Sequence, residues 1–533
     1  MCRPLNRQLL SGAEAYINTL EPRSGGACDA GGAYNQRRPK GVDKMVEIAI
    51  IGSGGAGLAA AIAARRAGAE VTVISKTAAA TACCTAYSAG LFSVPCGGVS
   101  PREQYEKLLK TGYGLNDRTL LTTLTEESLA SLEEIASWGV TLDFLKGRVS
   151  ARATAKNGLM GGGGMMEQMV RIAKDCGVKF REWSVAREIF VEKGRARGVS
   201  LTNWRSGHSS ALSADAVVLA AGGAGRLYSH TDNPERMTGD GYALALAAGL
   251  RLRDMEFVQF YPVGWAQEGF PRWMADATLG DFVRVTDAAG REFLPAAYKE
   301  WGVKDGKECN YFARDKLSLL LAQKDCEGGA FAHIEETPEE LWEDKKFLYA
   351  LTLPKEYFIG RKEPLRIAPL EHYFCGGVEI GASGETAVCG LYACGEVTGG
   401  IDGANRMGGN ALAHVVTFGL RAGRAAAKHP HEAPRDFIAI DEIKNLSPGG
   451  RPVSEIRAEL QKKAWQAIGP LRRAAEISDF LLYIEEIKKE AIKAETPLER
   501  LLALEMPGLT ASAEAVAKAA LARKESVGAH CII

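Results

Sequence analysis

The residues VEIAIIGSGGAG at 46–57 place a short apolar run directly before the glycine pattern G-x-G-x-x-G. An alanine-rich stretch follows at 58–68, and a second apolar run, VTVIS, stands at 71–75. This order predicts a strand, a tight glycine turn, a helix and a second, parallel strand. In such a unit the backbone of the turn approaches a pyrophosphate, and the N–H groups that begin the helix bind that anion. The pattern therefore predicts a dinucleotide site whose turn is formed by Gly52, Gly54 and Gly57.

The end of the second predicted strand departs from the common NAD-binding pattern. An acidic residue usually stands there and binds a ribose hydroxyl, whereas this chain has Ser75 and Lys76. The residues alone leave two interpretations: another side chain binds the ribose, or the site takes a dinucleotide other than NAD.

Two further apolar runs end in glycine and extend the predicted parallel sheet. They are ADAVVLAAGGAG at 214–225 and LYACGEV at 391–397. Strands so far apart in one sheet predict an α/β domain interrupted by an insertion. Charged amphipathic stretches at 455–473 and 478–495 predict helices near the C-terminus. We therefore expect an N-terminal extension at 1–44, a dinucleotide-binding domain at 45–261 and 372–430, an inserted domain at 262–371 and a helical domain at 431–533.

Charge and composition exclude several classes of function. Lys plus Arg and Asp plus Glu number 65 each, so nothing global favours binding to nucleic acid. No apolar run approaches the roughly eighteen residues of a membrane span, and the N-terminus lacks the apolar core of a secretory signal, which predicts a cytoplasmic protein without a transmembrane segment. The 12 cysteines are scattered without C-x-x-C pairs, so we expect reduced thiols and no metal site.

Six ordered segments add a more specific signal. They are TGDG at 238–241, RDMEFVQFYP at 253–262, ARDK at 313–316, HYFCGG at 372–377, GEVTGGIDGANRMGGNAL at 395–412 and ARKESVGAH at 522–530. Together they resemble the flavoprotein subunit of fumarate reductase and succinate dehydrogenase, a superfamily that also contains L-aspartate oxidase. The resemblance implies an α/β fold with a split Rossmann-like FAD-binding domain, an inserted α+β capping domain and a C-terminal helical domain.

The resemblance also implies which residues bind FAD. In relatives a Ser-Lys pair follows the second strand, as Ser75-Lys76 does here. Membrane-complex relatives tether FAD through the His of a Ser-His-Thr segment, whereas this chain has Cys83-Cys84-Thr85, so we expect noncovalent FAD. The implied cofactor-binding residues are Gly52, Gly54, Gly55, Ala56, Gly57, Ser75, Lys76, Thr85, Gly90, Ala221, Gly222, Asp240, Gly395, Glu396, Arg406, Asn410, Ala411 and Leu412.

Reduction of an activated C=C bond needs a hydride from flavin N5, a proton donor and positive charge for the enolate-like transition state. The resemblance assigns the proton donor to Arg314 and the clamp on a substrate carboxylate to His372 and Arg406. The tripeptide alone would allow Arg314 and Asp315 to be a surface ion pair. In relatives an acid and a second Arg supply the proton; Asp276 stands for the acid here, but Leu279 takes the place of the Arg, with Arg284 as a possible substitute.

Two departures from the family pattern concern the substrate. Relatives that reduce dicarboxylates hold the second carboxylate with a His and a Thr, where this chain has Tyr261 and Ala275. A buried carboxylate facing these residues would be poorly neutralised. We therefore expect an α,β-unsaturated monocarboxylate with a neutral, aromatic or cationic remote group, bound by Tyr261, Ala275, His372 and Arg406. Trp265 and Trp273 are either aromatic walls of that pocket or ordinary packing residues.

The leading hypothesis is therefore an FAD-dependent reductase of the fumarate reductase type. The alternatives are an enzyme like L-aspartate oxidase and a flavin-bearing electron-transfer subunit of a larger redox complex. No haem, cluster or second nucleotide motif is visible, so the electrons are expected from a separate donor protein, a reduced flavin or a nicotinamide.

Overall fold

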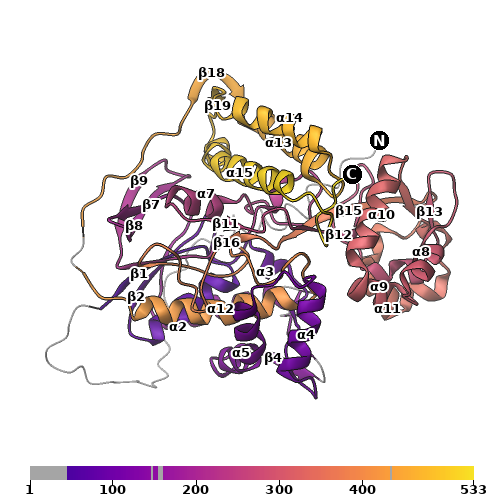
Figure 1. Cartoon of the computed structure of the whole chain (residues 1–533), viewed down its shortest axis with the longest axis horizontal. Coiled ribbons are helices and arrows are strands. Elements are labelled where there is room, and N and C mark those ends of the chain that lie inside the picture. The colour runs from indigo at the N-terminus through magenta and orange to yellow at the C-terminus, as the bar shows by residue number, and fades with distance from the viewer. Residues whose placement is uncertain (1–44, 146–147, 154–159, 433–434) are drawn as a thin grey trace.

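The computed structural model describes residues 45–145, 148–153, 160–432 and 435–533. The expected N-terminal extension, 1–44, lies outside the described residues. Five parallel strands form the central sheet in the order β17-β10-β1-β2-β6 (Figure 1). Their bounds are β1 Glu47–Ile51, β2 Glu70–Ile74, β6 Lys179–Arg181, β10 Ala216–Leu219 and β17 Leu391–Ala393.

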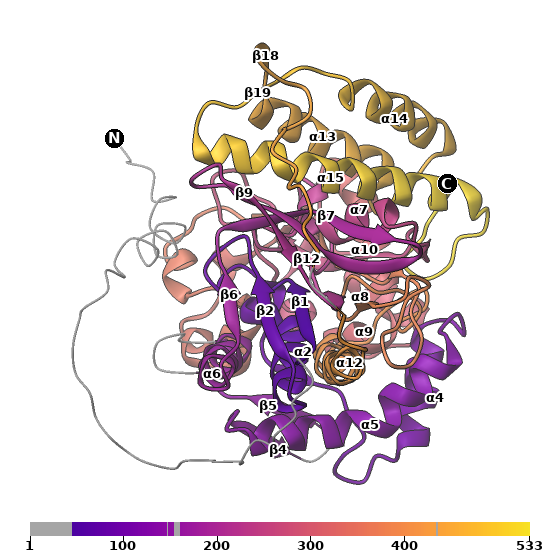
Figure 2. The ribbon, with the colours of Figure 1, turned by 90° about the vertical axis from the view of Figure 1, so that its left-hand side faces the viewer.

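The side chains of β1 alternate between two cores, as they do in a strand buried on both faces. Ile48 and Ile50 pack with helices α2 (Gly55–Arg66) and α12 (Asn410–Ala427), whereas Ala49 and Ile51 face the opposite side. Figure 2 shows α2 and α12 together on one side of the sheet and the C-terminal helices on the other. Glycines bring α2 and α12 close, because a Cβ at Gly423 would lie 2.2 Å from the Ala60 carbonyl oxygen.

The opposite side is covered by an antiparallel sheet and the C-terminal helices. The sheet consists of β7 Ser184–Glu192, β8 Arg195–Asn203 and β9 Ser209–Ser213, and the helices are α13 Val453–Ile468, α14 Ala474–Ile487 and α15 Pro497–Ala522. Both predicted C-terminal helices are present, but the predicted ends, at 473 and 495, are wrong. The first stops before Gly469-Pro470, where Pro cannot continue a helix, and β19 (Ile492–Lys493) follows the second.

The insertion forms a cap with its own core beside the central sheet (Figure 1). Its antiparallel sheet has the order β12-β15-β14-β13, with β12 Val258–Trp265, β13 Val285–Asp287, β14 Ala330–Ala332 and β15 Leu365–Phe374. Its helices are α8 Leu294–Trp301, α9 Gly306–Phe312, α10 Arg314–Cys326 and α11 Lys345–Leu351. The expected domain boundaries at 261/262 and 371/372 fall inside β12 and β15, and they stay predictions.

Further helices and strands complete the fold. They are α3 Cys84–Tyr87, β3 Leu91–Phe92, α4 Pro101–Thr111, α5 Arg118–Ser137, β4 Leu142–Leu145, β5 Arg148–Ala151, α6 Gly161–Asp175, η1 Gly225–Leu227, α7 Asp240–Ala247, β11 Leu252–Arg253, η2 Ala277–Asp281, η3 Ile334–Glu336, η4 Glu339–Glu343, η5 Lys355–Tyr357, β16 Gly377–Val378 and β18 Leu446–Pro452. The predicted α/β class with a helical C-terminal region is confirmed. Among the described residues, no helix is both long and apolar enough to span a membrane.

Candidate active site

A large cleft separates the carboxyl ends of the central strands from the cap and has a volume of about 4130 Å³. The sheet side contributes the glycine turn after β1, the residues after β2 and β17 and the start of α12. The cap side contributes β12, η2 and the start of α10. Arg314, His372 and Arg406, the predicted catalytic set, all line this one cleft.

The three glycines of the turn have different surroundings. Gly52 has φ +113°, and a Cβ there would lie 2.1 Å from the Ala220 carbonyl oxygen. A Cβ at Gly57 would lie 2.0 Å from the Gly52 carbonyl oxygen. Gly57 therefore allows helix α2 to pack closely against the turn that follows β1. A Cβ at Gly54 would meet only the Cys83 Cβ, at 3.6 Å. Gly54 therefore faces the cleft, where the backbone is free to approach a ligand.

Lys76 joins the end of β2 to the C-terminal helical region. Its ammonium lies 2.7 Å from an Asp240 carboxylate oxygen and 2.9 Å from a Glu505 carboxylate oxygen of α15. Glu505 is fully buried and also pairs with Arg236 and Arg457. The buried Glu505 carboxylate therefore holds the Lys76 corner of the cleft in place through three cations.

Glu396, after β17, presents a buried carboxyl group to the cleft. Burial raises its pKa to about 7, which the backbone N–H of Phe374, 3.1 Å from Oε1, partly opposes. A carboxyl group in this state donates or accepts a hydrogen bond to a hydroxyl group.

Arg406 lies in the loop before α12 and is 6% exposed. Its guanidinium carbon lies 4.4 Å from the centre of the Tyr373 ring, and its Nε has no hydrogen-bond partner among the described residues. A buried guanidinium with a free donor is suited to bind an anion. Ala411 and Leu412 also line the cleft, but Asn410 is buried and donates to Asp402 instead.

His372, on β15, is held by an acid that the sequence analysis missed. Its Nδ1 lies 2.8 Å from Oδ2 of Asp232, whose side chain is 6% exposed. Asn233 fixes both partners, because its amide donates to Asp232 Oδ1 at 3.2 Å and to the His372 carbonyl oxygen at 3.1 Å. No motif in the loop at 228–237 marks Asp232 as a partner of His372.

Arg314 begins α10 and points toward the loop of Arg406, since its Nη2 lies 3.1 Å from the position of a Cβ at Gly408. Its Nε donates to Asn310 at 2.9 Å, and its guanidinium carbon lies 5.0 Å from the centre of the Tyr261 ring. Burial lowers the pKa of Arg314, which favours release of a proton. Asp315 accepts a hydrogen bond from Tyr113, whereas Arg314 donates to Asn310, so the two side chains have different partners.

Of the cap residues predicted to contact the substrate, two line the cleft and one is buried in the core of the cap. Tyr261 lines the cleft, and its hydroxyl oxygen accepts the Ala277 N–H at 3.3 Å. Asp276 also lines the cleft and caps η2 through Thr278. Ala275, in contrast, is fully buried in the core of the cap and does not line the cleft, which corrects its predicted contact with substrate.

Two tryptophans and two residues of the expected proton relay also differ in whether they reach the cleft. Trp265 is fully buried and donates to the Leu351 carbonyl oxygen at 3.2 Å, so it is a packing residue. Trp273 lines the cleft, tilted against Tyr87 with ring centres 6.3 Å apart. Leu279 packs in the cap core, and Arg284, the candidate substitute in the relay, pairs with Glu336.

The segment in which some relatives tether FAD has two thiols here. Cys84 lines the cleft, and its thiol donates to Asn233 Oδ1 at 3.1 Å. Burial and the nearby Glu396, Glu371 and Asp232 raise the pKa of Cys84 well above its usual range. A thiol held protonated is a poor nucleophile, which supports the expectation of noncovalent FAD.

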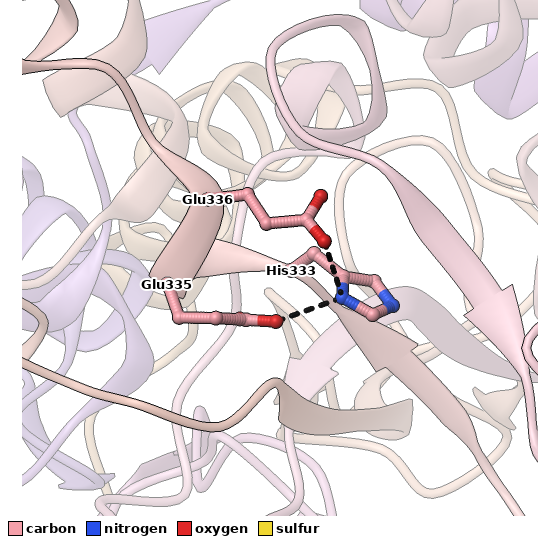
Figure 3. A group of neighbouring side chains, drawn as sticks. All are labelled: His333, Glu335 and Glu336. Carbon is pink, nitrogen blue, oxygen red and sulfur yellow. Dashed lines mark hydrogen bonds and ion pairs between the residues drawn. The ribbon is translucent and has the colours of Figure 1, made fainter.

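Outside this cleft, His333, Glu335 and Glu336 bring three ligand-type side chains together on the cap (Figure 3). His333 Nδ1 lies 2.8 Å from a Glu335 carboxylate oxygen. The Arg284 guanidinium pairs with Glu336 and lies 3.1 Å from His333 Nδ1. This cation already pairs with Glu336 and offsets the charge of one of the two carboxylates, so the structure gives no reason to place a metal ion there.

The residues on the sheet side fit FAD. Gly54, the N-cap of α2, has no side-chain cap, which leaves the N–H groups of the first turn other than that of Gly55 to a pyrophosphate. Glu396 and Asp240 offer oxygens to hydroxyl groups, and the unpartnered Nε of Arg406 offers a buried donor. Thr85 supports the same turn, because its hydroxyl accepts the Gly55 N–H at 3.3 Å.

Comparison with known proteins places these features in a group. A family described as FAD binding domain matches residues 47–412, and one described as fumarate reductase flavoprotein C-term matches residues 457–532. An uncharacterized FAD-dependent oxidoreductase of Methanocaldococcus jannaschii is 31% identical over 91% of this chain and 92% of its own. An L-aspartate oxidase of Mycobacterium leprae is 30% identical over 91% of both chains. The structure is similar to a quinol-fumarate reductase with menaquinol, with a TM-score of 0.78 and 26% identity over 92% of both chains.

Proposed function

Because the chain belongs to the FAD-binding family that contains fumarate reductase flavoprotein subunits and L-aspartate oxidases, it is an FAD-dependent oxidoreductase, and we propose that it reduces the C=C bond of an α,β-unsaturated monocarboxylate. The observation that supports this best is the convergence of Arg314, His372 and Arg406 on one cleft beside the glycine turn. FAD, when bound, supplies the hydride.

In this proposal each side chain has one task. Arg406 and His372 bind the substrate carboxylate, because a guanidinium and an imidazole offer donors that a carboxylate accepts. Arg314 holds the proton that the neighbouring carbon receives, at one of its Nη atoms. Its burial and its lowered pKa make that proton easier to release than from an exposed arginine. Asp276 lies on the same wall of the cleft, where its carboxylate is proposed to take a proton from solvent and pass it to Arg314 after each turnover.

The remote end of the substrate is proposed to be neutral, aromatic or cationic. Tyr261 offers an aromatic face there, and its hydroxyl oxygen already accepts the Ala277 N–H. Burial raises the pKa of Tyr261, so the phenol stays neutral. The guanidinium of Arg314, which lies against the Tyr261 ring, is needed at the reacting carbon and so does not serve to neutralise a second carboxylate at this end.

Steady-state turnover with a chemical reductant that replaces the unknown donor tests this function. Cinnamate and heteroaryl acrylates are expected to be reduced with a higher kcat/KM than fumarate. Efficient fumarate turnover would contradict the proposed substrate class. Formation of iminoaspartate with oxygen consumption would instead indicate an L-aspartate oxidase, and flavin reduction without turnover of any acid would indicate an electron-transfer subunit.

Two further parts of the proposal are tested separately. Denaturation is expected to release free FAD, and colour retained on the polypeptide would contradict noncovalent attachment. The electron source is proposed to be a separate donor protein, a reduced flavin or a nicotinamide. Anaerobic mixing with NADH, NADPH or reduced FMN will show whether a small carrier reduces the bound flavin directly.

A further inference from the structure

Asp232 is the one side chain that determines how His372 presents itself to the cleft. A carboxylate only accepts hydrogen bonds, so His372 Nδ1, 2.8 Å from Asp232 Oδ2, is the atom that bears the proton. The other ring nitrogen, Nε2, has no hydrogen bond among the described residues, and His372 lines the cleft. Nε2 is therefore the atom available to a ligand.

This arrangement restricts which form of His372 can bind a carboxylate. A neutral imidazole has one donor and one acceptor. With the donor committed to Asp232, the neutral ring would turn the Nε2 lone pair toward the substrate carboxylate, and the two would repel. Only the doubly protonated ring offers an N–H at Nε2. Carboxylate binding at this site thus requires a second proton on His372.

We propose that Asp232 is a positioning residue that stabilises His372 as an imidazolium and so couples substrate binding to the uptake of a proton. This inference rests on the proposed function, in which His372 binds the substrate carboxylate. Both carboxylate oxygens of Asp232 are engaged within the protein: Oδ2 faces His372 Nδ1, and Oδ1 accepts a hydrogen bond from the Asn233 amide.

The other titratable groups around the pair leave Asp232 as its nearest anionic partner. Burial raises the pKa of the neighbouring Glu371 carboxyl and of the Cys84 thiol well above their usual ranges, which favours the neutral form of both. The Tyr261 phenol, with its ring centre 5.4 Å from that of His372, is neutral for the same reason. The other charged groups near these residues in the cleft are Asp276, Glu396 and Arg226, together with the two active-site arginines, Arg314 and Arg406.

Both arginines favour the neutral imidazole, so the charge of Asp232 is what opposes them. Glu396, with a pKa of about 7, adds a partial negative charge from farther along the cleft. Removal of the Asp232 charge is therefore expected to favour the neutral imidazole, which lacks the Nε2 donor. A variant that keeps the shape of Asp232 but loses the charge separates this effect from packing.

The test measures binding of non-reducible carboxylates, 3-phenylpropionate and acetate, to the holoenzyme by the change in flavin absorbance between pH 5.5 and 8.5. Wild-type affinity is expected to fall as pH rises, because His372 loses its second proton. Asp232→Asn is expected to bind at least 10-fold more weakly at pH 7.5 and to recover most of that loss at pH 5.5. Calorimetry in two buffers of different ionisation enthalpy counts the protons taken up.

Matched variants identify the cause. Asp232→Glu is expected to restore part of the affinity, and His372→Gln to remove the pH dependence. Glu235→Gln neutralises another acid of the same loop, whose partner is Arg226, and is expected to bind both probes as the wild type does. Each variant is first shown to retain FAD and its visible spectrum.

The outcomes separate this inference from the proposed function. If the wild type binds carboxylates with proton uptake but reduces no unsaturated acid, the function fails and the role of Asp232 stands. If cinnamate is reduced but Asp232→Asn shows the wild-type affinity and pH dependence, the role of Asp232 fails and the function stands. An affinity loss in Asp232→Asn that low pH does not restore also overturns the inference, and a wild type that binds no carboxylate overturns both.

Discussion

The two sides of the cleft are built in different ways. The sheet side is backbone and buried residues at the ends of parallel strands: a glycine turn, Glu396 and the loop of Arg406. The cap side presents side chains, including Arg314, and leaves large aromatic residues exposed, with Phe312 71% exposed and Tyr349 57% exposed. The sheet side follows the family pattern, whereas the cap side departs from it at Tyr261, Ala275 and Leu279. In the proposed function the sheet side therefore holds the cofactor and, through Arg406, the substrate carboxylate, whereas the cap side faces the reacting carbon and the remote end of the substrate.

The largest effect is expected from the cap side. Arg314→Ala is expected to lower kcat for the best acid by about 10³-fold or more, the range for loss of a general acid. Flavin content and reduction by dithionite should stay unchanged, since both depend on the other side. Lys316→Ala, an exposed cation on the same helix, is the control. Normal turnover by Arg314→Ala would end the assignment of the proton donor.

Alanine substitutions at two glycines of the turn, Gly52 and Gly54, test the sheet side. Gly52→Ala combines φ +113° with a Cβ 2.1 Å from the Ala220 carbonyl oxygen, and is expected to destabilise the fold by roughly 3 kcal/mol or more. Gly54→Ala meets no such contact and is expected to fold but lose FAD, because the new methyl group stands where the pyrophosphate approaches. Thermal unfolding and the bound-flavin ratio distinguish them. Equal FAD retention in Gly54→Ala and wild type would contradict the predicted pyrophosphate position.

Glu396 makes the sheet side sensitive to pH. Its folded-state pKa of about 7 lies above the ordinary glutamate value of 4.5, so folding favours the protonated carboxyl group. That stability is fully present below pH 4.5 and is lost as pH rises through 7. The FAD-free protein is therefore expected to lose on the order of 3 kcal/mol of unfolding free energy between pH 4.5 and 8. Denaturant titrations should show Glu396→Gln lacking this decline.

The smallest effect concerns specificity at the cap. Tyr261→His restores the donor that dicarboxylate-reducing relatives have, and is expected to raise kcat/KM for fumarate relative to cinnamate by about 10-fold, or about 1.4 kcal/mol. Tyr261→Phe keeps the aromatic face and is expected to leave the preference for cinnamate unchanged. If the ratio of kcat/KM for fumarate to that for cinnamate is the same in Tyr261→His as in the wild type, Tyr261 does not determine the substrate.

How much the sequence reveals depends on how local each interaction is. The glycine turn and the strands beside it were predictable, because a strand, a turn and a helix follow each other within about twenty residues. Asp232 was not, since its partner His372 lies 140 residues away and both stand in segments without a periodic pattern. The pairing of Lys76 with Glu505 spans 429 residues.

The burial of Ala275 could not be inferred for a related reason. The segment between β12 and η2 has no strand or helix period, so its side-chain directions are set by packing in the cap. Resemblance placed Ala275 by position in the chain, whereas the core of the cap determines which side chains reach the cleft. Tyr261 lies within a strand, and there the prediction and the structure agree on a residue that faces the ligand space.

The cap is joined to the sheet domain by the paired strands β12 and β15, and Tyr261 lies on one of them while His372 lies on the other. The pairing is irregular on both sides of Tyr261, between Gln259 and Phe260 and between Tyr261 and Gly264. A ribbon bends most readily where its ladder is interrupted. In the proposed function Tyr261 and His372 contact the two ends of the substrate, so bending of this ribbon would alter the distance between these two side chains whenever the cap moves.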